Sequence, residues 1–141
     1  MNILIDTNAA LDALLERQPF YAAASRVLSL STLGVGIFVS ASAITDIYYI
    51  GRRHFGNKKT AMDLVKRLMT KADAATVSDA EIRRAIALDW GDFEDAVQYA
   101  SGERLAVDYI VTRNPADFSA AALPVVTPKG LLSMIISKKS E

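Results

Sequence analysis

The sequence Asn2-Ile-Leu-Ile-Asp-Thr-Asn8 places a short apolar run directly before three polar side chains. A run of this length and character, ended by a polar segment, is typical of a buried strand followed by a loop. Similar runs predict further strands at 36–40, 74–77, 108–112 and 125–126. Because segments with a helical pattern separate the strands, we predict an α/β fold with a parallel sheet covered on both faces.

The helical segments are recognised by their apolar periodicity and by the residues at their ends. We expect Ser42 to cap the helix that continues to about His54, and Ser78 with Glu81 to form a capping box at the start of another. In the segment 58–71, the pattern predicts a buried stripe of Met62, Val65, Leu68 and Met69. The other helices are expected at 9–16, 19–33, 92–104 and from 128 onward.

Composition limits the class of protein. A chain of 141 residues with 51% hydrophobic residues is enough for one domain, 1–141, with a real core. There are no cysteines, which excludes disulfides, thiolate metal sites and thiol nucleophiles. No signal-peptide pattern and no apolar run of about 20 residues is present, so we expect a cytoplasmic protein without a membrane span. The net charge is zero, and any nucleic-acid binding must come from a local patch.

Two acidic residues stand out by their positions. Asp6 directly follows the first strand, at the sheet edge where parallel folds bind ligands, although capping the next helix is an equally good interpretation. Asp46 lies in the middle of a nearly all-apolar helix, where an acid costs free energy unless it is paired or binds a cation. The ordinary alternative for Asp46 is an ion pair with Arg53.

A second group of acids lies further along the chain. Asp92, Glu94 and Asp95 crowd the start of one helix, where the helix dipole favours acids, so this cluster taken alone is more readily structural. Asp117 lies in the loop after the strand at 108–112. If these acids meet Asp6 and Asp46 at one sheet edge, a cation is needed to offset their repulsion. Oxygen ligands without a cysteine or histidine cluster select Mg²⁺ or Mn²⁺, which support phosphodiester hydrolysis.

In this order and spacing, several segments make the chain similar to a known family. They are Ile-Leu-Ile-Asp-Thr-Asn at the start, Ser-Ala-Ile-Thr-Asp-Ile-Tyr-Tyr-Ile, Asp-Phe-Glu-Asp-Ala-Val-Gln-Tyr-Ala, and Asp-Tyr-Ile-Val-Thr-Arg-Asn-Pro-Ala-Asp-Phe. The chain resembles the PIN-domain ribonucleases, in particular the VapC-like toxins of bacterial toxin–antitoxin pairs. The resemblance implies a three-layer α/β/α sandwich around a parallel, twisted sheet of four or five short strands. It also implies a metal-dependent endoribonuclease, a cognate antitoxin and a homodimer.

The resemblance also implies roles for single residues. Asp6 and Asp95 match the first and third acids of the family's metal site, and Asp46 falls at the second position, where the wider family more often has Glu. The family commonly has an acid after Thr-Arg, where this chain has Asn114, and another before Phe, which is Asp117 here. The expected catalytic and metal-binding residues are therefore Asp6, Asp46, Asp95 and Asp117, and the resemblance leaves open whether Asn114 or Asp117 completes the site. The expected accessory residues are Thr7, Asn8, Asp92, Thr112 and Asn114, and the expected phosphate contacts are Arg113 and Arg53.

Other functions are less consistent with the sequence. Haloacid-dehalogenase-like phosphatases have Asp-x-Asp after the first strand, and receiver domains have paired acids there, whereas this chain has Asp6-Thr7-Asn8. A Walker-type phosphate loop is absent, and His54 is the sole histidine, which disfavours a Ser-His-Asp triad. The non-enzymatic alternative is a catalytically weak or inactive PIN-like module that binds RNA or a protein partner, because Asn114 replaces an acid.

Overall fold

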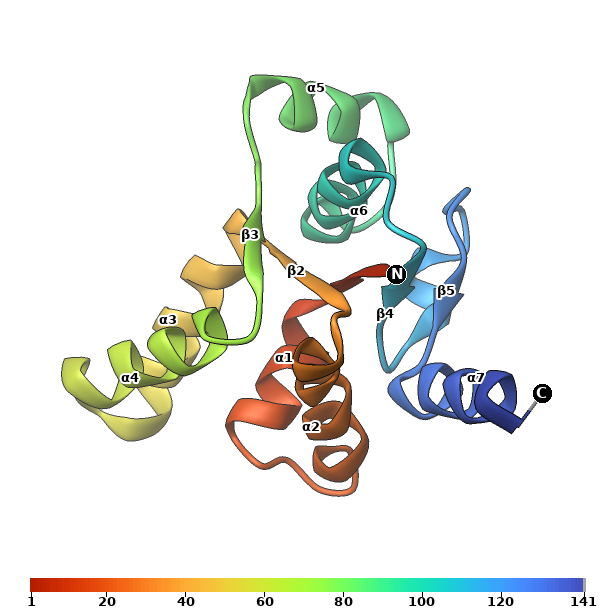
Figure 1. Cartoon of the computed structure of the whole chain (residues 1–141). Helices are drawn as coiled ribbons and strands as arrows, with labels where there is room; N and C mark the ends of the chain where they lie inside the picture. Colours follow the sequence, from red (N-terminus) through yellow and green to blue (C-terminus); the bar gives the residue numbers. More distant parts are fainter. Residues whose placement is uncertain (141) are drawn as a thin grey trace.

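A parallel sheet with the strand order β3-β2-β1-β4-β5 lies at the centre of the computed structural model, which describes residues 1–140 (Figure 1). Every neighbouring pair of strands in it is parallel, as the sequence predicted. The strands are short: β1 (Asn2–Ile5), β2 (Gly36–Ser40), β3 (Asp73–Ala75), β4 (Tyr109–Val111) and β5 (Val125–Val126).

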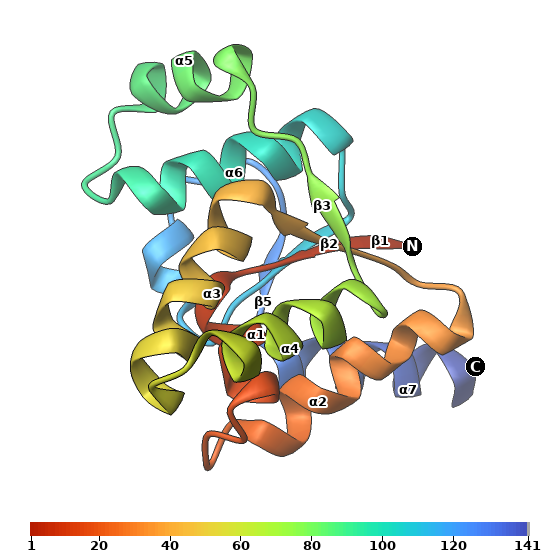
Figure 2. The same cartoon turned by 90° about the vertical axis from the view of Figure 1, so that its left-hand side faces the viewer.

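Helices cover both faces of the sheet, which confirms the three-layer α/β/α fold. The layers are clear in Figure 1: α1, α2 and α7 lie against one face, and α6 lies against the other with α5 packed on its outer side. Helices α3 and α4 pack on each other beside the sheet (Figure 2). Among residues 1–140, no helix is both long and apolar enough to cross a membrane. The helices are α1 (Thr7–Leu14), α2 (Tyr21–Ser29), α3 (Ala41–Phe55), α4 (Lys58–Met69), α5 (Asp79–Leu88), α6 (Phe93–Leu105) and α7 (Pro128–Ser140).

The central strand β1 divides the core between the two faces of the sheet. Ile3 and Ile5 belong to the cluster that includes the buried residues of α1, α2 and α7, whereas Leu4 packs in the cluster of Tyr99 on α6. This alternation follows from the two-residue period of a strand. Ile3, Leu4 and Ile5 are fully buried, so the end of β1, and with it Asp6, is fixed by packing on both faces.

The start of α3 differs from the prediction by two residues. Ser40 stands at the N-cap position and the helix begins at Ala41, so Ser42 lies within the first turn instead of capping it. The Ser42 hydroxyl lies 2.9 Å from the Ser40 hydroxyl. The strand β2 therefore passes directly into α3 without a loop, which the sequence pattern did not indicate.

The buried face of α4 also differs from the predicted stripe. Leu68 is buried as expected, but Met62 and Met69 are exposed and the neighbours Ala61 and Leu64 are buried instead. The reason is the close approach of α3, where a Cβ atom on Gly51 would lie 2.8 Å from Leu64 Cδ1. Leu64 occupies the space that Gly51 leaves free and Ala61 lies beside it, so this face of α4 packs on α3 and the two methionines lie at the surface.

Candidate metal centre

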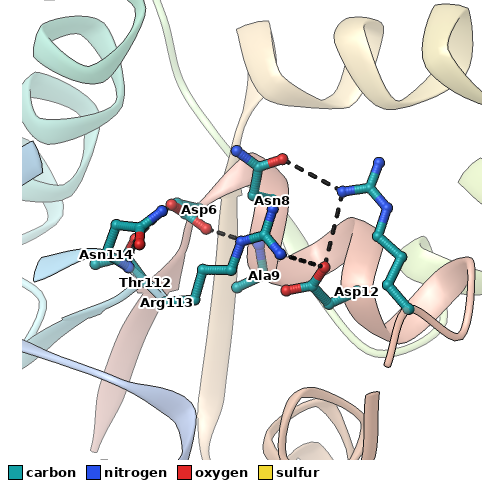
Figure 3. Close-up of polar contacts among 8 residues, drawn as sticks. Asp6, Asn8, Ala9, Asp12, Thr112, Arg113 and Asn114 are labelled. Carbon is teal, nitrogen blue, oxygen red and sulfur yellow. Dashed lines mark hydrogen bonds and ion pairs between the residues drawn. The ribbon is translucent and has the colours of Figure 1, made fainter. Parts of the chain in front are cut away.

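Asp6 lies at the carboxyl edge of the sheet, next to the end of β4. The register pairs Ile5 with Val111, which places Thr112 beside Asp6. The Thr112 hydroxyl donates to Asp6 Oδ2 at 2.6 Å, and the Ala9 backbone N–H donates to Asp6 Oδ1 at 2.8 Å (Figure 3). Asp6 is thus the N-cap of α1 and also lies at the carboxyl edge of the sheet. Capping the helix is therefore compatible with a role in ligand binding. Burial raises its pKa, while the hydrogen bonds from Thr112 and Ala9 lower it.

Asp95 reaches the same edge from the first turn of α6. Its backbone N–H donates to Asp92 Oδ1 at 3.0 Å, which makes Asp92 the N-cap of α6. The pKa of the half-buried Asp95 rises from its ordinary value of 3.8 to about 7. Burial is the largest cause, followed by repulsion from four other carboxylates: Asp92, Asp117, Asp6 and Glu94. Acids from β1, α6 and the segment after β4 are therefore close enough to repel one another.

Asp46 on α3 interacts with Glu94 on α6. Burial raises the pKa of Glu94, and the hydrogen bond with the Asp46 side chain and the charge of Asp46 raise it further. No ion pair joins Arg53 to Asp46 in the described part of the chain, so the ordinary alternative for Asp46 is not observed. Glu94 was not among the predicted site residues. Its place in the crowded first turn of α6 was the available signal, but the sequence did not show that α3 faces this turn.

Thr7 connects the start of α1 to α6. Its hydroxyl lies 3.3 Å from Glu94 Oε1 and 3.3 Å from Gln98 Oε1, and its backbone N–H donates to Gln98 Oε1 at 3.1 Å. Gln98 is buried and was not predicted as a site residue. It lies four residues after Glu94, on the same face of α6. These bonds fix the distance between the helix that follows Asp6 and the helix that carries Asp95.

The segment after β4 brings Asn114 and Asp117 to the edge of the site. A 3₁₀ turn covers Pro115–Phe118, with Asn114 at its N-cap position. The Asn114 backbone N–H donates to the Thr112 hydroxyl at 3.2 Å. Both side chains are exposed, and the charge of Asp117 acts on Asp95. Asp117 thus contributes negative charge to the cluster, whereas Asn114 is tied to it through its backbone.

Arg113 is held beside the acids by an interaction that the sequence did not reveal. Its Nη1 lies 3.4 Å from Oδ1 of Asp12, an acid whose side chain is only 1% exposed (Figure 3). The Arg113 guanidinium also lies 4.5 Å from the centre of the Phe20 ring. Arg17 Nη1 approaches the same Asp12 oxygen at 3.7 Å and donates to Asn8 Oδ1 at 3.4 Å. The available signal for Asp12 was a charged residue within an otherwise apolar helix.

Arg53 is the predicted site residue that the structure does not bring to the acids. It is exposed near the end of α3, about two helical turns or roughly 10 Å along the axis from Asp46. At the edge, the charges of Asp6 and Asp117 act on Asp95 and the charge of Arg113 acts on Asp6, whereas Asp46 is connected to this group only through Glu94.

The donor set fits a hard divalent cation in its chemistry, since every candidate ligand is an oxygen and the acids repel one another. Within residues 1–140, however, no three acidic, histidine or cysteine side chains are spaced to hold one ion. The carboxylates are near one another but do not converge on a common point. Binding an ion would require side-chain rotation that draws them together.

Comparisons with known proteins agree with this architecture. No curated protein matches the chain in sequence. Among solved structures, it is similar to VapBC2 from Rickettsia felis, with a TM-score of 0.71 at 14% identity over 90% of this chain and 98% of that one. It is similar to VapC20 of Mycobacterium tuberculosis, described as a Sarcin-Ricin loop cleaving toxin, with a TM-score of 0.68 at 14% identity over 84% and 94% of the two chains. A toxin–antitoxin complex from Klebsiella pneumoniae matches with a TM-score of 0.64 at 24% identity, over 89% of this chain and 97% of that one.

The PIN domain model matches residues 2–116, and the chain therefore belongs to the PIN domain family.

Proposed function

We propose that this protein is a metal-dependent endoribonuclease that hydrolyses RNA phosphodiesters at the carboxyl edge of its sheet. Asp6, Asp46, Asp95 and Asp117 are the proposed ligands for Mg²⁺ or Mn²⁺. The observation that carries the proposal is the crowding of carboxylates around Asp95, whose pKa rises to about 7 because of burial first and of this repulsion second. Repulsion among carboxylates destabilises the folded protein, and a bound cation would offset it. Such a cluster is therefore typical of a cation-binding site.

The contacts of each residue at this edge of the sheet suggest its role in the proposed reaction. Bound at this edge, a divalent ion would supply activated water and stabilise negative charge on the phosphodiester. Asp6 is oriented for ligation because Thr112 and the Ala9 backbone fix both of its oxygens. Asp92 fixes the first turn of α6, and Thr7 fixes α6 relative to α1. Arg113 supplies positive charge next to Asp6, which suits an adjacent phosphate of the substrate. Asn8 and Asn114 complete the proposed accessory set.

We further propose that the chain is the toxin of a toxin–antitoxin pair. Membership of the PIN domain family and the similarity to the VapC20 toxin and to toxin–antitoxin complexes support this proposal. The proposed partners are an antitoxin that covers the acidic edge and a second copy of the chain. Co-purification of the chain with the product of a neighbouring small reading frame would test the first, and light scattering of the purified chain would test the second.

The activity is tested by incubating labelled RNA with the protein in Mg²⁺, in Mn²⁺ and in chelator. We expect endonucleolytic cleavage with either metal and none with chelator. Asp6→Asn and Asp95→Asn should remove cleavage, whereas Asp63→Asn, a matched change of an exposed acid on α4, should leave it intact. Cleavage in chelator, or full turnover by either edge variant, would contradict the proposal.

The second candidate is a catalytically weak or inactive PIN-like module that binds RNA or a protein partner. Two observations favour it: no ready-made three-ligand group exists in residues 1–140, and the position after Thr112-Arg113 carries an amide. Calorimetric titration with Mg²⁺ distinguishes the two. A nuclease should bind the ion in wild type and lose binding in Asp6→Asn, whereas a pure binding module should show no ion binding that depends on Asp6.

A further inference from the structure

A small cavity lies next to Arg113, beside the edge of the sheet that carries Asp6, Asp95 and Asp117, which we call the acidic edge. It has a volume of about 200 Å³, and Phe20, Arg113 and Lys129 line it together with Pro19, Thr127 and Pro128. Arg113 belongs to both places, because its charge acts on Asp6 while its guanidinium lies over the Phe20 ring. Any group that occupies the cavity is therefore next to the proposed site of cleavage.

The cavity combines flat apolar walls with two cations. Phe20 is 39% exposed, so part of its ring is accessible to an occupant of the cavity. Lys129 lies in the first turn of α7, where Thr127 caps the helix by accepting from the Gly130 backbone N–H at 3.0 Å. An occupant that matches these surfaces has a planar apolar part and at least one negative charge.

Arg113 is fixed in place for this purpose by the buried Asp12. The ion pair with Asp12 uses Nη1 of the guanidinium, and an arginine has five N–H donors in total. The Phe20 ring holds one face of the guanidinium, which lowers the conformational entropy that binding an anion would otherwise cost. Asp12 is not one of the proposed metal ligands. Its ion pair places the guanidinium of Arg113 between the acidic edge and the cavity.

We propose that this cavity is a subsite for one nucleotide of single-stranded RNA, adjacent to the phosphodiester that is cut. The base packs against Pro19 and Phe20, and a phosphate lies between Arg113 and Lys129. A volume of about 200 Å³ is below the roughly 300–1,000 Å³ that drug-sized ligands occupy, which limits the occupant to one nucleotide. A base in a duplex is not available for such packing, so the subsite requires an unpaired residue. This inference rests on the proposed function.

The test is the affinity for a short, fluorescently labelled, single-stranded oligoribonucleotide, measured by anisotropy in chelator so that no cleavage occurs. Phe20→Leu should weaken binding by roughly tenfold, the size of one base-stacking contact, and Phe20→Tyr should keep wild-type affinity. Lys129→Met should lower the slope of log affinity against log salt by about 0.7, as expected for one lost phosphate contact on a single strand. An abasic oligomer of the same length should bind wild type more weakly and should not distinguish Phe20→Leu from wild type.

Matched controls are available on α3 and α4. Phe55 is 41% exposed at the end of α3, and Lys66 is exposed on α4, so Phe55→Leu and Lys66→Met change the same chemistry elsewhere. Both controls should bind as wild type does. Equal losses in Phe55→Leu and Phe20→Leu, or equal affinity of wild type for the abasic oligomer, would overturn the subsite. If wild type cleaves RNA with metal while Phe20→Leu binds normally, only the subsite fails. If wild type neither binds nor cleaves RNA, the proposed function fails with it.

Discussion

Asp95→Asn should stabilise the metal-free protein near neutral pH, although it removes an acid from a helix start. The pKa of Asp95 rises from 3.8 to about 7 in the folded protein, so the folded state holds a proton more tightly than the unfolded chain does. Where the folded state binds more protons, stability falls as the pH rises. The wild type should therefore lose stability between about pH 4 and pH 7, and the neutral amide should not.

The size of the effect follows from the same shift. A pKa change from 3.8 to about 7 corresponds to roughly 4 kcal/mol if none of it is screened. Asp95 is only half-buried, and solvent screening reduces this to about 1–2 kcal/mol. Loss of the favourable helix-dipole interaction subtracts about 0.3–1 kcal/mol. In a domain of this size, a net gain of about 1 kcal/mol raises the melting temperature by roughly 2–4 °C.

The assay is thermal unfolding of both proteins in chelator at several pH values and again in millimolar Mg²⁺. In chelator at neutral pH, Asp95→Asn should melt higher than wild type, and the two curves should approach each other toward pH 4. Added Mg²⁺ should stabilise wild type by mass action and leave the variant nearly unchanged. If the variant melts lower at every pH and gains as much from Mg²⁺ as wild type does, Asp95 only supports the helix and the reasoning is wrong.

Three further predictions concern other parts of the molecule. Asp117→Ala should weaken Mg²⁺ binding, measured by calorimetry, more than Asn114→Ala does, because the charge of Asp117 acts on Asp95; the reverse order would make Asn114 the ligand. Asp12→Asn should cost less than about 1 kcal/mol in urea unfolding, because burial raises the pKa of Asp12 in spite of Arg113 and Arg17, and both arginines that lose their partner are partly exposed; a loss of about 3–5 kcal/mol, as for a broken buried pair, would contradict this. Leu64→Ala should cost about 2–5 kcal/mol in the same assay, whereas the exposed Met62→Ala should cost well below that; equal costs would return Met62 to the buried face of α4.

The parallel sheet could be predicted from the sequence, because its strands are short apolar runs separated by segments with a helical pattern. The position of Asp6 at the sheet edge followed in the same way, since it directly succeeds a strand that is buried on both faces. The capping box of Ser78 and Glu81 was also confirmed, because it depends on neighbouring residues alone.

What the sequence did not reveal depends on contacts between distant elements. To predict the interaction of Asp46 with Glu94, one would need to know that α3 faces the start of α6. To predict the ion pair of Asp12 with Arg113, one would need to know that β4 lies beside β1. The buried face of α4 was predicted wrongly because apolar periodicity did not distinguish Met62 from Leu64, whereas the close approach at Gly51 does. The roles of the four acids as ligands stay predictions.

The central claim is that Asp6, Asp46, Asp95 and Asp117 form one metal site, and paramagnetic broadening by Mn²⁺ tests it most directly. In a titration followed by amide NMR, the first signals to broaden in wild type should be those of Thr7, Ala96 and Thr112, which flank the acidic edge. In Asp6→Asn the same amides should broaden only at much higher Mn²⁺ concentration. Broadening that is centred on exposed acids elsewhere, such as Asp63 on α4, and that is unchanged in Asp6→Asn would contradict the account.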